Sequence, residues 1–140
     1  MKKFLLAAAM VLMMSGMVFA ADEPAQTQVD YKQKALESAA RSKKLREALP
    51  DVMNAFGEMG KATLKDGVLS LKTKELIAVA LSVNAHCEMC ITSHVQNAIK
   101  AGVTREEIVE ALAVATLMGG GPSSAYSAIV LEAYDQFSAK

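Results

Sequence analysis

Both cysteines and both histidines of the chain lie within ten residues, between Ala85 and His94. Cys87 and Cys90 are three residues apart, and His94 follows four residues after Cys90. If the chain is helical from about Cys87, these three side chains share one helix face. A thiolate attacks peroxides and disulfides, and the pKa of a cysteine falls at a helix N-terminus, in a Cys-x-x-Cys pair and beside an imidazole. The stretch therefore predicts a redox-active dithiol with a base beside one sulfur.

The two sulfurs differ in their position along this predicted helix. Cys90 lies one turn before His94, so its thiol can pass a proton to the imidazole without a backbone rearrangement. Cys87 lies at the N-terminal edge and is expected to be the more exposed sulfur, which an external thiol can reach. In thioredoxin-like dithiols the exposed N-terminal cysteine is the attacking one, so position alone leaves the nucleophile open.

A structural disulfide is the first alternative, because exported proteins commonly use cysteine pairs in this way. A bridge that closes only four residues stabilises a fold by roughly 2 kcal/mol on the loop-entropy estimate, and here it ties a segment that is already helical. Such a bridge would add little to the stability of the fold. The tight spacing of Cys87 and Cys90, with His94 beside them, favours redox function instead.

A zinc site is the second alternative, since His86, Cys87, Cys90 and His94 supply two imidazoles and two thiolates. The adjacent His86 and Cys87 would have to point at one ion, and no second segment would hold the metal from outside. Covalent haem attachment needs a histidine directly after the second cysteine, and Ile91 stands there. His86 lies at the predicted end of a helix, where a capping role is favoured over catalysis.

Glu75 lies in a predicted helix that leads straight into the dithiol. This helix runs from Leu71 to about Ala85, with Ser70 as its N-cap, and it is apolar on nearly every side. Such a helix is expected to be buried, so Glu75 is carried into a buried or interfacial place. Because a buried carboxylate near an imidazole can hold or relay a proton, we expect Glu75 to orient His94.

The chain before this helix predicts two further helices. Residues 31–49 are rich in helix formers and charge, with a thin apolar stripe. Pro50 suits a helix start, and the helix that it opens ends before a turn at Asp66 and Gly67.

The chain after the dithiol also predicts helices, with no strand and no internal repeat. Gly102 is a left-handed stop for the dithiol helix, and residues 104–107 form a capping box that opens the next helix. The run Gly119–Pro122 predicts an abrupt end in a tight turn, followed by a last helix over residues 123–137. The fold class is therefore all-α, a single-domain helical bundle.

Residues 1–20 have the pattern of a signal peptide. Lys2 and Lys3 give a positive start, residues 4–19 are apolar apart from Ser15-Gly16, and small residues precede the junction after Ala20. A membrane anchor is the competing interpretation, but the apolar run is near the lower limit for a span. We therefore expect cleavage and an exported, periplasmic or secreted protein, with no membrane contact after cleavage.

The mature chain divides into a short arm and one domain. Residues 21–30 are polar, carry Pro24 and predict a flexible arm, and residues 31–140 form the helical redox domain. Removing residues 1–20 leaves 13 basic and 15 acidic residues and a net charge of −2, which gives no reason to expect nucleic acid as a partner. The helices that begin at Leu71 and Thr104 carry more apolar surface than about 120 residues can bury, so we expect a homo-oligomer.

The spacing Glu75-x11-Cys87-x2-Cys90-x3-His94 resembles the redox motif of the peroxidase branch of the alkyl hydroperoxidase D-like, or carboxymuconolactone decarboxylase-like, family. The likeness extends over about residues 50–137, and it includes Lys74-Glu75-Leu76-Ile77-Ala78 and the Gly119–Pro122 run. The resemblance implies an all-α bundle that assembles as trimers or hexamers. It also implies that Cys90 is the peroxidatic cysteine, that Cys87 is the resolving cysteine, and that His94 and Glu75 form a proton relay.

One position departs from the founding peroxidases, which carry a second histidine between the cysteines where this chain has Met89. The decarboxylase branch lacks the dithiol, which argues against that activity here. We expect an exported thiol peroxidase that reduces hydroperoxides with an external dithiol or protein reductant and no bound cofactor or metal. The alternatives are a thiol–disulfide exchange protein without peroxidase activity and a non-catalytic zinc or small-molecule binding module.

Overall fold

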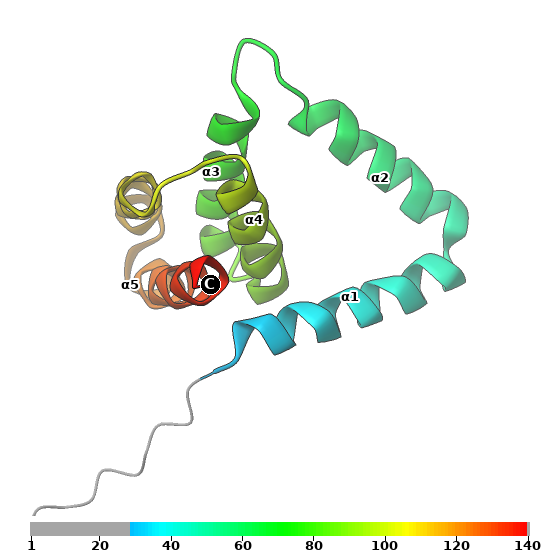
Figure 1. Ribbon diagram of the computed structural model, residues 1–140, viewed down its shortest axis with the longest axis horizontal. Coiled ribbons are helices and arrows are strands. Elements are labelled where there is room, and N and C mark those ends of the chain that lie inside the picture. Colours follow the sequence, from blue (N-terminus) through cyan, green and yellow to red (C-terminus); the bar gives the residue numbers. More distant parts are fainter. Residues whose placement is uncertain (1–28, 140) are drawn as a thin grey trace, which may run out of the picture.

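The computed structural model describes residues 29–139, in which the chain forms five helices and no strand (Figure 1). The helices are α1 (Tyr31–Ala48), α2 (Pro50–Leu64), α3 (Leu71–Asn84), α4 (Glu88–Lys100) and α5 (Arg105–Ser138). The all-α prediction is confirmed. The predicted signal peptide and most of the predicted arm lie outside the described residues. None of the described helices is long and apolar enough to span a membrane.

The core lies between α3, α4 and the two halves of α5. On α4 the fully buried side chains are Ile91, Val95 and Ala98, which recur at the helical spacing of four and three residues. They pack in one cluster with Val79 and Val83 of α3 and with buried residues of α5. Burying each large aliphatic side chain stabilises the fold by roughly 1.5–3 kcal/mol. This packing fixes α3 against α4, and with them the positions of the predicted site residues.

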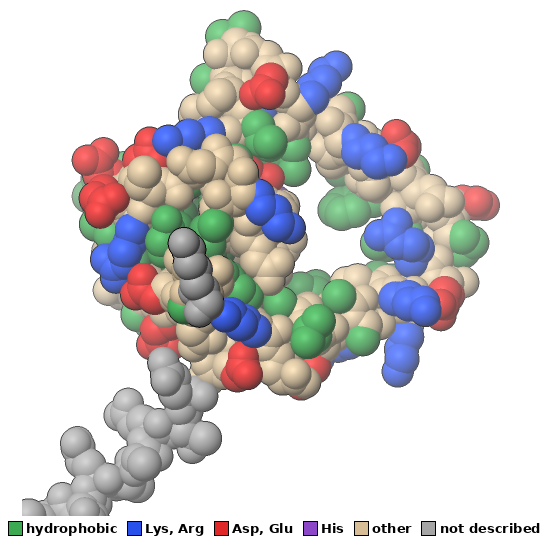
Figure 2. Space-filling view, in the orientation of Figure 1, with side chains coloured by type: hydrophobic (Ala, Val, Ile, Leu, Met, Phe, Trp, Pro, Cys, Tyr) green, Lys and Arg blue, Asp and Glu red, His purple; other side chains and the backbone are tan. Residues whose placement is uncertain are grey.

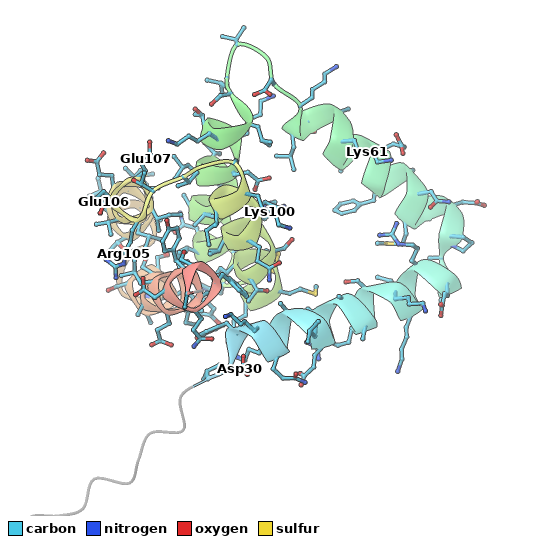
Figure 3. All side chains as sticks on the ribbon, viewed as in Figure 1. Asp30, Lys61, Lys100, Arg105, Glu106 and Glu107 are labelled. Atoms are coloured by element: carbon cyan, nitrogen blue, oxygen red, sulfur yellow. A yellow bond between two sulfur atoms is a disulfide. The ribbon has the colours of Figure 1, made fainter. Side chains whose placement is uncertain are left out.

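The start of α5 is closed by the predicted capping box. The Thr104 side chain accepts from the backbone N–H of Glu107, and the Glu107 carboxylate accepts from the N–H of Thr104 at 2.8 Å. A hydrogen bond from Lys72 of α3, followed by the backbone bond, holds the pKa of Glu107 below its ordinary value. Arg105 pairs with Asp135 of the second half of α5. Figure 3 shows Arg105 and Glu107 at this end of the molecule.

The glycine run breaks α5 into two helical halves, as the sequence predicts. Gly120 leaves the helical conformation, with φ 66° and ψ −150°, so the first half ends there and a second half resumes through Pro122 (Figure 1). Pro122 is tolerated because it lies in the first turn after the kink, where a backbone N–H has no intrahelical partner. The run is therefore a kink between two halves of α5.

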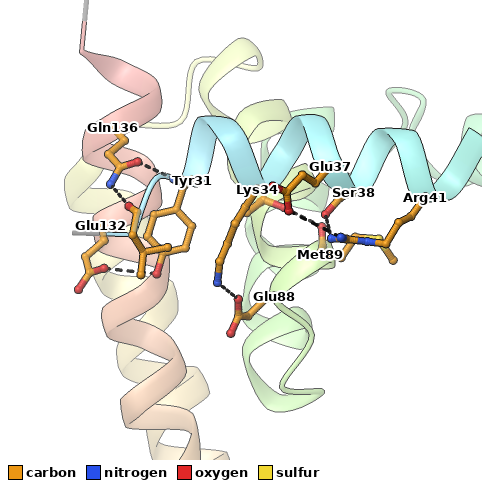
Figure 4. A network of polar contacts seen from close by, with 11 residues as sticks. Tyr31, Lys34, Glu37, Ser38, Arg41, Glu88, Met89, Glu132 and Gln136 are labelled. Atoms are coloured by element: carbon orange, nitrogen blue, oxygen red, sulfur yellow. Dashed lines mark hydrogen bonds and ion pairs between the residues drawn. The ribbon is translucent and has the colours of Figure 1, made fainter. Parts of the chain in front are cut away.

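The N-terminal half of α1 is anchored on α5 and α4 (Figure 4). Tyr31 is buried, its backbone N–H donates to Gln136 at 2.7 Å, and its hydroxyl donates to Glu132 at 3.3 Å. Burial, followed by the nearby Glu132 carboxylate, raises the pKa of Tyr31 to about 12. Lys34 forms an ion pair with Glu88 in the first turn of α4. These contacts hold α1 beside the helix that carries the dithiol.

The helix α2 has no buried residue, although it has a clear apolar face. Val52, Phe56 and Met59 are each about 60 % exposed. Figure 2 shows an opening between α2 and the rest of the molecule. An isolated helix of 15 residues with two glycines is marginal in water. The apolar face of α2 therefore lacks a full partner within the described chain.

The helix α3 is buried on its inner side only, which corrects the expectation that it is buried on nearly every side. Glu75, Val79 and Val83 are buried, whereas Leu81 is 62 % exposed. On α5, Leu117 is 81 % exposed. The core of this chain therefore covers only some of the apolar side chains of α3.

Candidate active site

The turn between α3 and α4 positions the first cysteine. The N–H of His86 donates to the carbonyl of Val83, and the N–H of Cys87 donates to the carbonyl of Ser82. This pair of bonds is a Schellman motif, and His86 takes its left-handed position with φ 52°. His86 thus lies at a helix end, as predicted. A non-glycine residue in this conformation costs roughly 1–2 kcal/mol.

Cys87 is the N-cap of α4, which begins at Glu88, one residue later than expected. The Cys87 sulfur accepts from the backbone N–H of Cys90 at 3.2 Å, and the two sulfurs form a disulfide. Both cysteines are half-buried. An N–H donor at a helix start favours negative charge on sulfur, so the local geometry stabilises a thiolate once the disulfide is reduced.

The structure brings Glu75 and His94 together, as predicted. The Glu75 carboxyl oxygen Oε2 lies 2.8 Å from Nδ1 of His94. Glu75 is only 2 % exposed, whereas the His94 side chain is 28 % exposed. Because Glu75 occupies Nδ1, it orients the ring and leaves Nε2 for proton exchange.

A cavity of about 380 Å³ lies between α1, α2 and α4. Cys90 and His94 both line it, but Cys87 does not. The rest of the wall consists of alanine and hydroxyl side chains of α1, Phe56 of α2, and uncharged side chains of α4 including Met89. This volume is in the range of small-molecule sites, and the wall suits an uncharged, largely apolar molecule.

Met89 lies at the seam between α1 and α4 (Figure 4). It is 48 % exposed and its sulfur lies 3.9 Å from the hydroxyl of Ser42. It also lines a smaller cavity of about 200 Å³ that includes Lys34, Arg41 and Glu88. Met89, like Ser38 and Thr92, therefore lines both the uncharged cavity beside Cys90 and the charged one.

The opposite side of the turn is packed against α5 by residues whose part in the site does not follow from the sequence. The rings of His86 and Tyr126 are stacked, with centroids 4.7 Å apart and planes at 27°. Ser123 is fully buried and donates to the side-chain carbonyl of Asn84 at 2.6 Å. A Cβ on Gly119 would lie 1.9 Å from the Ser123 hydroxyl, so a glycine is needed here. No local sequence signal connects these positions, because each contact joins helices far apart in the chain.

Metal ligands do not gather in the described part of the chain. Across residues 29–139, no group of three or more His, Cys, Asp or Glu side chains is placed to hold a metal ion. The two cysteine sulfurs are bonded to each other.

The fold and the site define an all-α protein with a Cys-x-x-Cys disulfide at the start of a helix. One turn after the second cysteine lies a histidine, which a buried glutamate of the preceding helix holds. The sequence model of the carboxymuconolactone decarboxylase family matches residues 50–133, and the chain belongs to this family. The resemblance inferred from the motif is thus confirmed at the level of the family.

The chain is also similar to several relatives and to a solved structure of a member of this family. A protein of Cupriavidus necator is 41 % identical over 95 residues, which are 68 % of this chain and 84 % of the relative. A protein in the cox locus of Paracoccus denitrificans is 39 % identical over 59 % of this chain and 75 % of its own length. The crystal structure of an apo carboxymuconolactone decarboxylase family protein from Legionella pneumophila superposes with a TM-score of 0.75 at 42 % identity. The match covers 78 % of this chain and 97 % of that protein.

Proposed function

We propose that the protein is a thiol-dependent peroxidase that reduces hydroperoxides through a dithiol–disulfide cycle of Cys87 and Cys90. One observation carries this proposal: Cys90 and His94 line the same uncharged cavity, and the buried Glu75 holds Nδ1 of His94. A nucleophile with an oriented base, open to a small-molecule cavity, is the arrangement that peroxide attack needs.

The oxidative half-reaction begins from the reduced dithiol. Nε2 of His94 takes the proton of the Cys90 thiol, and the thiolate attacks the terminal oxygen of the hydroperoxide. The O–O bond breaks, His94 returns the proton to the departing alkoxide, and Cys90 becomes a sulfenic acid. The Cys87 thiol then condenses with the sulfenic acid, which releases water and forms the disulfide.

The reductive half-reaction uses an external dithiol or protein reductant, and no bound cofactor takes part. Two electrons and two protons from that dithiol regenerate both cysteine thiols. The decisive experiment measures peroxide consumption with dithiothreitol as reductant and an apolar organic hydroperoxide as substrate. We expect turnover that Cys90→Ser abolishes. No consumption above the rate of dithiothreitol alone would rule the proposal out.

Thiol–disulfide exchange without peroxide is the second candidate. It is favoured by the N-cap position of Cys87, where the N–H of Cys90 points at the sulfur and stabilises a leaving or attacking thiolate. A protein that reduces or oxidises a model disulfide but leaves peroxide untouched would support this candidate over the first.

We also propose that the chain works as a homo-oligomer. The support is the exposed apolar face of α2, together with the exposed Leu81 of α3 and Leu117 of α5. The family resemblance suggests a trimer or a hexamer. Light scattering at micromolar concentration is expected to give a multiple of the chain mass, and Leu117→Glu is expected to lower it. A monomer for the unmodified protein would contradict the proposal.

The place of action that we propose is outside the cytoplasm, in the periplasm or the medium, after residues 1–20 are removed. The support is the charged, apolar and small-residue pattern of that segment. Mass spectrometry of the protein from its own cells tests this, with a mature chain that begins at Ala21 as the expected result. An intact N-terminus in the cytoplasmic fraction would contradict it.

A further inference from the structure

We propose that His86 is the proton-transfer group for Cys87 when a thiol reductant opens the disulfide. This inference rests on the proposed thiol cycle, and it gives the second histidine of the site a function. In this account each imidazole serves one sulfur: His94 serves Cys90, and His86 serves Cys87.

The backbone at His86 gives the first reason. His86 occupies the left-handed position of the Schellman motif that ends α3, with φ 52°. The end of α4 has the same pair of hydrogen bonds, and there Gly102 takes the left-handed position with φ 78°. The turn therefore does not require an imidazole, and glycine fits it without strain. A strained residue next to a reactive group is a sign of function.

The contact with Tyr126 gives the second reason. The two rings are stacked, so the imidazole has a fixed orientation although His86 is exposed. Tyr126 itself packs against the core of the bundle. Tyr126 is the titratable group of α5 that contacts the His86 ring. Glu88, which follows His86 by two residues, is paired with Lys34 of α1. The ring is thus both positioned and open to solvent, as proton exchange requires.

The third reason is that the two sulfurs lie differently with respect to the cavity of about 380 Å³. Cys87 does not line the cavity that Cys90 and His94 share, so a reductant that reaches Cys87 approaches outside that cavity. His86 precedes Cys87 directly in the chain and lies on the α5 side of the turn. His94 remains beside Cys90, where it can protonate that sulfur when it leaves.

A dithiol reductant opens the disulfide in two thiol exchanges. His86 takes a proton from the first reductant thiol, whose thiolate attacks the Cys87 sulfur. The bond between the two cysteine sulfurs breaks, and Cys90 leaves as a thiolate. The second reductant thiol then attacks the mixed disulfide, and His86 gives its proton to the departing Cys87 thiolate. The proton of that second thiol passes through solvent and His94 to the Cys90 thiolate, which leaves His94 neutral for the next oxidative half-reaction. The reductant is oxidised by two electrons, and two cysteine thiols are formed.

The test starts from the oxidised protein and uses no peroxide, so it measures the contribution of His86 to disulfide opening even if the peroxidase proposal fails. The rate of disulfide opening by dithiothreitol is measured from pH 5.5 to 8.5 by quenched alkylation of the released thiols. We expect His86→Asn and His86→Gly to slow the reaction at neutral pH by about tenfold, below the usual range for acid–base groups because the ring is exposed. The rate should also depend less on pH in both variants than in the unmodified protein.

A phosphine reductant is the matched control, because its phosphorus attacks sulfur without giving up a proton. The two variants are expected to keep the rate of phosphine reduction. Both replacements tolerate φ > 0, so the turn is retained, and His86→Gly should be at least as stable to urea as the unmodified protein. Equal slowing with the thiol and the phosphine, or no slowing with the thiol, would overturn the proposal and leave His86 a purely structural residue.

Discussion

Nδ1 of His94 lies 2.8 Å from Oε2 of Glu75, a contact that joins α4 to α3 across 19 residues of sequence. Glu75 is almost completely buried, so solvent hardly screens its effect on the ring. The buried cluster of α3 and α4 holds the two side chains at this distance. The proposed reactivity of Cys90 therefore depends on the packing of two helices as well as on the local dithiol motif.

Replacing Glu75 with glutamine should test this dependence. The amide retains a hydrogen-bonding group beside His94 but removes the negative charge that supports the imidazolium, so we expect oxidation of Cys90 by peroxide to slow by about tenfold or more. Stopped-flow measurements of the reduced protein with a hydroperoxide give this rate. Glu110→Gln, at an exposed position of α5, is the matched control and should react at the original rate. An unchanged rate for Glu75→Gln would show that the pair has no part in activating the thiol.

Gly119 should be intolerant of a side chain. In Gly119→Ala the new Cβ would meet the buried Ser123 side chain and Asn84, so the end of α3 and the kink of α5 must move apart. We expect the free energy of unfolding in urea to fall by about 1–3 kcal/mol, the usual cost of overpacking. Gly121→Ala is the control, because a Cβ there has no neighbour within 4 Å, and it should change stability much less. Equal effects of the two substitutions would contradict the close packing at Gly119.

The parts of the site that follow from the sequence are those fixed by local geometry. The spacing of Cys87, Cys90 and His94 defines one helix face wherever that helix lies, so their grouping was predictable. Glu75 was predictable only on the condition that its helix packs alongside, which the structure meets. The contact of Tyr126 with His86 was not predictable, because it depends on how α5 folds back over the turn.

Two features of the helices show what sequence patterns can and cannot predict. Gly119–Pro122 carries local signals for a helix end, and α5 does break there, at Gly120, before proline fits the first turn of the resumed helix. By contrast, the apolar pattern of α3 shows which residues avoid water but not what covers them, and Leu81 remains exposed in this chain. Tertiary packing decides this second point.

The anchoring of α1 should be sensitive to alkaline pH through Tyr31. Burial, followed by Glu132, raises the pKa of Tyr31 from 10.0 to about 12, so the unfolded chain loses this proton at a lower pH than the folded protein. The stabilisation is complete below pH 10 and is lost as the pH rises to about 12, and it amounts to at most about 3 kcal/mol. Urea unfolding of the unmodified protein and Tyr31→Phe between pH 9 and 12 measures it. Parallel stability curves for the two proteins would contradict the assigned role of the hydroxyl.

The central claim is that Cys90 attacks peroxide and Cys87 resolves the sulfenic acid. Single-turnover reactions of reduced Cys87→Ser and Cys90→Ser with one equivalent of hydroperoxide test it most directly, with a sulfenic acid reagent and mass spectrometry as the readout. Because Cys90 shares the cavity with His94, we predict a sulfenic acid on Cys90 in Cys87→Ser and no fast reaction in Cys90→Ser. Fast sulfenic acid formation on Cys87 in Cys90→Ser, with none in Cys87→Ser, would contradict the account and reverse the two roles.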